Sequence, residues 1–137
     1  MESSNCSQQT FLGFDFGTRR TGVAVGQSLT QTASTLTTLK SKNGKPDWLM
    51  ISKLIEEWKP DALVVGIPYH MDNTAQEMTL AARKFCRQLE GRYHLTVHEA
   101  EERLSSWSVE QQHGSGRDDI DELAAQLILQ DWLQHKD

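Results

Sequence analysis

The sequence predicts an α/β fold in which one mixed sheet of five strands carries helices on both faces. Two observations predict it. Three extended segments come first along the chain, and helical and extended segments alternate after them. Consecutive strands favour antiparallel pairing, whereas strands separated by helices favour parallel pairing. The two patterns together therefore indicate a single sheet that contains both kinds of pairing.

The first half of the chain supplies three of the five strands. Apolar residues interrupted by glycines mark strands at 11–16 and 22–28, and the short segment 17–21 joins them as a hairpin. A third extended segment at 34–39 is rich in threonine, which suits a strand. Residues 1–10 are polar, with neither a basic start nor an apolar core, so we expect a flexible leader and not a secretion signal.

The middle of the chain alternates between helix and strand. Asp47 is the expected N-cap of a helix with apolar residues at helical spacing, and Pro60 ends that helix. The wholly apolar run at 62–68 is typical of a strand that is covered on both faces. A helix at about 74–90 and an alternating strand at 94–100 follow it.

The last part of the chain predicts a helix or loop at about 105–113 and then a final helix, capped by Asp118 or Asp119. The residues expected on the core side of that helix are Ile120, Leu123, Ala124, Leu127 and Ile128. No linker or internal repeat divides the chain, so residues 11–137 are expected to form one domain.

Composition narrows the classes of function. The 137 residues carry a formal net charge of −5, which argues against a protein that coats nucleic acid nonspecifically. It does not exclude a nuclease, because a catalytic metal site must itself be acidic. The two cysteines, Cys6 and Cys86, fit no metal spacing and favour a reducing, cytoplasmic compartment. No apolar run approaches the length that spans a membrane.

Acidic residues stand at the ends of three apolar elements. Asp15 lies in the first strand, Glu101 and Glu102 follow the strand at 94–100, and Asp121 lies in the first turn of the last helix. A buried acid is costly unless it is paired or binds a metal. Three carboxylates that converge at one end of a sheet repel one another, and a divalent cation removes that repulsion.

Hard oxygen ligands of this kind select Mg²⁺ or Mn²⁺, and two such ions can activate water and stabilise the leaving oxygen of a phosphodiester. Each acid also has a simpler interpretation. Asp15 could cap a turn or pair with Arg19 or Arg20. The two glutamates could be a solvated strand end, and Asp121 could be a first-turn acid that answers the helix dipole.

Four motifs resemble one family in the order of that family. "DFGTRRTGVAVG", "VVGIPYHMDNT", "EERLSS" and "IDELAAQLILQDWL" are similar to segments of the YqgF (RuvX-like) family, over about Phe11 to Leu133. Members of this family were first described as Holliday junction resolvases, and bacterial members are assigned as pre-16S rRNA nucleases. The resemblance implies an RNase H-like fold, so that residues 11–137 would form one RNase H-like nuclease domain.

The resemblance also implies that Asp15, Glu102 and Asp121 are the catalytic residues and the ligands of Mg²⁺ or Mn²⁺. Thr18 and Arg19, in the turn after the first motif, could face a phosphate. Arg103 follows the motif glutamate and could orient that acid or contact the substrate.

Two features depart from the family pattern. Glu101 stands where the family has an aspartate, and the segment at 107–119 is short and poor in lysine. In relatives this segment is longer and more basic, so the departure bears on how the protein engages its substrate.

The function expected from these observations is a metal-dependent nuclease that processes the 5′ end of precursor 16S rRNA, with structured RNA or a ribosomal particle as its partner. A Holliday junction resolvase is the alternative within the same chemistry. It would act on branched DNA and would have to be a symmetric dimer, and the sequence leaves the oligomeric state open.

Two further alternatives belong to other classes. A phosphotransferase of the actin and sugar-kinase type also begins with an Asp-x-Gly-Thr hairpin, but that architecture needs two lobes and 137 residues supply one. A non-catalytic RNase H-like binding module is the other, and the short segment before Asp121 is its support.

Overall fold

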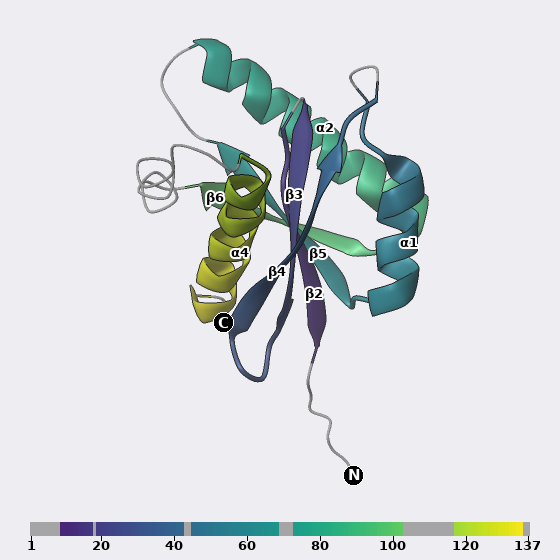
Figure 1. The fold of residues 1–137 in the computed structure, drawn as a ribbon, viewed down its shortest axis with the longest axis vertical. Helices are drawn as coiled ribbons and strands as arrows, with labels where there is room; N and C mark the ends of the chain where they lie inside the picture. The colour runs from purple at the N-terminus through teal and green to yellow at the C-terminus, as the bar shows by residue number, and fades with distance from the viewer. Residues whose placement is uncertain (1–8, 18, 43–44, 69–72, 103–116, 136–137) are drawn as a thin grey trace.

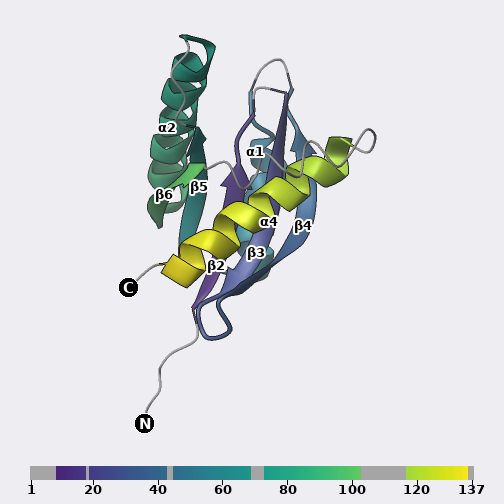
Figure 2. The ribbon, with the colours of Figure 1, turned by 90° about the vertical axis from the view of Figure 1, so that its left-hand side faces the viewer.

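The computed structural model describes residues 9–17, 19–42, 45–68, 73–102 and 117–135. These ranges form one sheet with helices against both of its faces, as Figures 1 and 2 show. The predicted helix or loop at 105–113 lies outside them, and so does most of the predicted leader. The first described strand begins at Thr10.

The sheet has the strand order β4-β3-β2-β5-β6. Its strands are β2 (Thr10–Asp15), β3 (Arg20–Gln27), β4 (Thr32–Lys40), β5 (Ala62–Pro68) and β6 (Thr96–Glu102). β2, β3 and β4 pair antiparallel, whereas β2, β5 and β6 pair parallel. The predicted mixed sheet of five strands is therefore confirmed, with β2 at its centre.

The helices divide between the two faces of the sheet. α1 (Trp48–Trp58) and α2 (Asn73–Tyr93) cover one face, and α4 (Arg117–His135) crosses the other (Figure 2). The buried apolar side chains accordingly form two clusters, one beneath α1 and α2 and one beneath α4. Among the described residues, no helix has both the length and the apolar character that a membrane span requires.

Alternation along β2 builds both clusters from one strand. Leu12 and Phe14 belong to the cluster beneath α1 and α2, whereas Phe11 belongs to the cluster beneath α4. Successive side chains of a strand point to opposite faces of the sheet. When helices cover both faces of a sheet, a central strand is apolar on both sides. Its sequence is therefore a continuous apolar run, as in the first strand.

Local signals fix the ends of α1 as the sequence predicts. The side chain of Asp47 accepts a hydrogen bond from the backbone N–H of Met50 at 3.3 Å, which satisfies one of the free donors in the first turn. Lys59 adopts a left-handed conformation with φ of 47°, and its N–H donates to the Ile55 carbonyl at 2.8 Å. Pro60 follows directly and cannot continue the helix.

Helix α2 and strand β6 both extend beyond their predicted ends. α2 continues to Tyr93, whose hydroxyl forms a 2.8 Å hydrogen bond with Ser52 of α1. His94 then reverses the chain with φ of 57°. β6 starts only after this turn and includes Glu101 and Glu102, which the sequence analysis placed after the strand. The tertiary contact of Tyr93 is thus one reason that the helix runs past its predicted end.

The predictions for α4 are correct in part. The helix begins at Arg117, so Asp118 and Asp119 lie in its first turn and the predicted cap is wrong. The expected core side is also partly wrong. Ile128 is buried, but the other buried positions among the described side chains of α4 are Ala125, Leu129 and Leu133, and Leu123, Ala124 and Leu127 are only partly buried. The side chain of Ile120 lies outside the described part.

Two glycines of the sheet select this face of α4. A Cβ atom on Gly13 would lie 2.8 Å from Cβ of Leu129, and one on Gly26 would lie 2.8 Å from Cδ1 of Leu133. Because neither glycine has a side chain, α4 packs on the backbone of β2 and β3 at these points. The apolar residues of α4 surround much of the helix, so the sequence pattern alone does not distinguish this face from its neighbour.

Replacement of Gly13 by alanine is expected to lower the free energy of unfolding by about 1–3 kcal/mol, because the added methyl group overpacks the contact with Leu129. Gly91→Ala is the matched control. Gly91 lies in α2 with open space around it, so alanine should raise stability by about 0.5–1 kcal/mol. Urea unfolding measures both, and equal effects would contradict the close approach of α4.

The thiol of Cys86 is expected to be unreactive in the folded protein. Cys86 is 5% exposed, and burial, followed by the charges of Glu99 and Glu90, raises its pKa from 9.0 to about 12. The folded state disfavours the thiolate, so the contribution of Cys86 to the free energy of unfolding is fully present below about pH 9. It is lost as the pH rises toward 12, because the unfolded chain then releases the thiol proton first. A Cys6→Ser variant should react with a disulfide reagent at pH 8 only in urea. Rapid labelling without urea would contradict the burial.

Candidate functional site

Asp15 is the last residue of β2, the central strand, and is partly buried. Its neighbours on both sides are anchored beneath α2. The rings of Phe14 and Phe16 lie 5.6 Å and 4.9 Å from the ring of Phe85. Since side chains alternate along a strand, anchoring these two phenylalanines directs Asp15 to the opposite face, which α4 covers.

Glu102 is the last residue of β6 and lies at the same end of the sheet as Asp15. β2, β5 and β6 run parallel, and the register pairs Phe14 with Val65 and Glu102 with Pro68. The carboxyl ends of all three strands therefore lie at one end of the sheet. A single strand separates Asp15 from Glu102, which is about 10 Å across the sheet, and the register places Glu102 two residues beyond the level of Asp15 along the strands. The side chain of Glu102 lies outside the described part of the structure.

Asp121 lies in the N-terminal part of α4, and its side chain is likewise not among those described. Its position is four residues before Ala125 and eight before Leu129, both of which are fully buried. Positions with this spacing share one face of a helix. Asp121 thus continues the line of residues that α4 packs on the sheet.

Helix α4 crosses the sheet from β4 toward β6. Gln126 hydrogen-bonds to Ala33 of β4, whereas Trp132 contacts Phe11 of β2 and His98 of β6. Figure 2 shows the same diagonal course. Asp121 therefore lies toward the β4 side, Glu102 lies at the end of β6, and Asp15 lies on the strand between them. Alternation along β2 directs Asp15 to the side of the sheet that α4 covers, and α4 itself carries Asp121.

The predicted substrate-binding residues follow Asp15 and Glu102 closely in the sequence, but the structure describes only one of them. Thr18 and Arg103 fall outside the described ranges. Arg19 is exposed in the connection between β2 and β3, and its carbonyl accepts a hydrogen bond from the Ser41 N–H at 2.9 Å. This bond ties the connection to the end of β4.

A metal ion suits the chemistry of the three acids. Their carboxylates are hard oxygen donors, and Asp15 projects from a rigid strand, so the set fits Mg²⁺ or Mn²⁺ better than a softer metal. Among the side chains that the structure describes, no group of three from His, Cys, Asp and Glu could hold a metal ion. Glu102 and Asp121 do not belong to those side chains.

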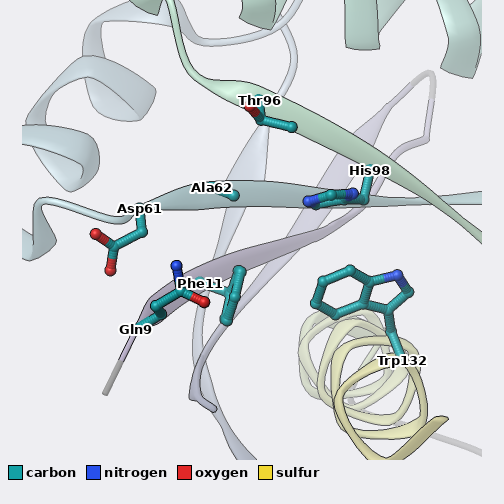
Figure 3. A pocket seen from close by; sticks show the side chains of 7 residues that line it. All are labelled: Gln9, Phe11, Asp61, Ala62, Thr96, His98 and Trp132. Carbon is teal, nitrogen blue, oxygen red and sulfur yellow. The ribbon is translucent and has the colours of Figure 1, made fainter. Parts of the chain in front are cut away.

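An open pocket that the sequence pattern does not predict lies at the opposite end of the sheet (Figure 3). It has a volume of about 470 Å³ and is lined by Gln9, Phe11, Asp61, Ala62, Thr96, His98 and Trp132. The ring of His98 packs 4.8 Å from that of Trp132, and the ring of Phe11 meets the same indole edge-on at 5.2 Å. These contacts join β2, β6 and α4, which are distant in sequence, so no local sequence pattern predicts the pocket.

Residues 9–135 match the RuvX family, which is described as Holliday junction resolvase. The chain belongs to this family. A protein of Pseudomonas putida is 50% identical over 131 residues, which cover 90% of this chain and 93% of that protein. One of Azotobacter vinelandii is 46% identical over 132 residues, with coverage of 91% and 93%. Both relatives carry the name "Putative pre-16S rRNA nuclease".

Two solved structures resemble the RuvX chain in fold. T. thermophilus RuvC in complex with a Holliday junction substrate superposes with a TM-score of 0.55 at 14% identity, covering 92% of this chain and 94% of RuvC. Fowlpox virus resolvase in complex with Holliday junction DNA gives 0.52 at 12% identity, with coverage of 91% and 97%. Identities this low support the fold alone, and at that level they confirm the predicted RNase H-like architecture.

Proposed function

We propose that this RuvX-family chain is a metal-dependent nuclease that processes the 5′ end of precursor 16S rRNA in the cytoplasm. Relatives that are about half identical over nearly their whole length, and that carry the pre-16S rRNA nuclease name, support the substrate. The observation that carries the chemistry is the position of Asp15. An acid at the end of the central strand stands between Phe14, which is buried, and Phe16, which is partly buried, and faces away from both of their contacts with Phe85.

Asp15, Glu102 and Asp121 are the residues that would hold one or two Mg²⁺ or Mn²⁺ ions. Bound ions of this kind favour attack of water on the phosphorus and departure of the 3′ oxygen. The contribution of the chain is to bring the acids together and to hold them. β2 is hydrogen-bonded on both sides, by β3 and β5, so Asp15 ends a strand that has a partner on either side.

Arg19, Thr18 and Arg103 are the proposed substrate contacts. Arg19 is exposed four residues after Asp15 in the chain, so we place its guanidinium where a phosphate near the acids could bind. The net charge of −5 gives the protein little general affinity for nucleic acid. A ribosomal particle that carries the precursor would supply that affinity through other contacts.

A Holliday junction resolvase is the second candidate, because the description of the RuvX family names that activity. A junction has two-fold symmetry, and its resolution needs two active sites placed across it by a symmetric dimer. The substrate assay and the oligomeric state of the protein together distinguish this candidate from rRNA processing.

Asp15→Asn is expected to abolish cleavage of a precursor 16S fragment while the fold is kept. The loss should exceed the roughly 100-fold that is typical of removing an outer-shell partner of a metal ligand. Asp61→Asn is the matched control, because it makes the same charge change on an exposed acid at the opposite end of the sheet. Gel assays with Mn²⁺ and circular dichroism measure the two effects. Parental cleavage by Asp15→Asn would refute the assignment.

Substrate choice is tested by incubating the parent protein separately with a precursor 16S fragment and a four-way DNA junction. With Mn²⁺ we expect 5′ shortening of the RNA and an intact junction, and chelator should abolish the RNA product. Cleavage of the junction alone would support the resolvase instead. Failure to cut either substrate, together with copurification with ribosomal particles, would favour a non-catalytic module.

A further inference from the structure

Two glutamines of α4 bind the backbone of a single residue on the edge strand β4. Nε2 of Gln126 donates to the carbonyl oxygen of Ala33 at 2.8 Å, and the Ala33 N–H donates to Oε1 of Gln130 at 3.2 Å. Ala33 is only 5% exposed. We refer to these three residues as the glutamine clamp.

The clamp takes the place that a further strand would occupy. Ala33 stands opposite Gly26 in the antiparallel pair of β3 and β4. In such a pair, alternate residues of an edge strand turn both backbone groups away from the partner strand. The amides of Gln126 and Gln130 supply one donor and one acceptor to the two outward groups of Ala33. The helix is therefore bonded to the edge of the sheet as well as packed on its face.

These bonds constrain α4 in a way that its apolar contacts do not. Leu129 and Leu133 pack on Gly13 and Gly26, and such contacts limit how far the helix stands from the sheet. Dispersion contacts have little directionality, whereas hydrogen bonds weaken steeply when they are bent. Two bonds to one residue therefore fix the rotation of α4 and its sideways position over β4.

The rotation of α4 decides where Asp121 lies. Asp121 is five residues before Gln126, which is about 7.5 Å along the helix axis. A turn of the helix about its axis moves both positions together. An acid that must share a metal ion with residues of the sheet tolerates little of such movement, since metal affinity depends on how its ligands are oriented.

We propose that Gln126, supported by Gln130, is a positioning residue that holds Asp121 in place for the metal ion of the nuclease. This inference rests on the proposed function. It assigns no contact with the substrate to either glutamine. Their effect on the reaction passes through the backbone of Ala33 and the orientation of α4.

The test uses three substitutions of the same size and charge on one helix. In Gln126→Glu the donor to the Ala33 carbonyl is lost, and a carboxylate faces that oxygen. In Gln130→Glu an acceptor for the Ala33 N–H is kept. Gln134→Glu, at an exposed position in the next turn, is the control for the added charge. The charge at 126 is nearest to the three acids and would by itself strengthen cation binding, so electrostatics opposes the predicted effect.

Two measurements are made on the intact protein. Calorimetry gives the Mn²⁺ dissociation constant, and hydrogen exchange of the Ala33 amide in metal-free protein reports the clamp itself. Gln126→Glu should weaken Mn²⁺ binding about tenfold, as the loss of outer-shell support does, and should speed exchange at Ala33. Gln130→Glu and Gln134→Glu should have the same Mn²⁺ dissociation constant and the same exchange rate at the Ala33 amide. Gln126→Met, which has no donor and no charge, should weaken Mn²⁺ binding in the same direction.

The inference is overturned if Gln126→Glu and Gln134→Glu bind Mn²⁺ equally well. It is also overturned if Gln126→Glu lowers the melting temperature without changing the Mn²⁺ dissociation constant, because that result describes a purely structural bond. Asp121→Asn separates this failure from failure of the proposed function. If Asp121→Asn binds Mn²⁺ as the parent does, the metal site itself is misassigned, whatever the glutamine variants show.

Discussion

The close approach of α4 to the sheet is the constraint on which the rest of the structure depends. Gly13 and Gly26 lie where a Cβ atom would come within 2.8 Å of Leu129 or Leu133. The absence of two side chains from the sheet therefore selects the buried face of the helix. With that face chosen, Gln126 reaches the edge of β4, and Asp121 falls on the line that continues from Ala125 toward the helix N-terminus.

The carboxylate of Asp15 owes its position to the aromatic residues beside it. Phe14 and Phe16 both pack on Phe85, so the strand places them on one face and Asp15 on the other. Aromatic pairs contribute beyond the area that they bury, and here they bracket the acid. Both faces of β2 are packed along most of its length, and the acid stands at the end of the strand, on the face opposite to the two phenylalanines.

The sequence predicts the fold well where the signals are local. The helix cap at Asp47 and the apolar strand at 62–68 are found where the residues place them. Predictions fail where a distant contact decides. The hydrogen bond between Tyr93 and Ser52 accompanies a longer α2 and a later β6. For the site, the sequence and the family resemblance name the acids, but the glutamine clamp could not be anticipated, because nothing local pairs Gln126 with Ala33.

The parallel and antiparallel halves of the sheet contribute differently to the proposed site. The parallel half brings the carboxyl ends of β2 and β6 to one edge, and with them Asp15 and Glu102. The antiparallel hairpin of β3 and β4 bears none of the three acids. It forms the surface on which α4 is seated, through Gly26 and Ala33. Under the proposed function, a residue of this hairpin acts on the metal site through α4, because the third acid is carried by the helix that the hairpin holds.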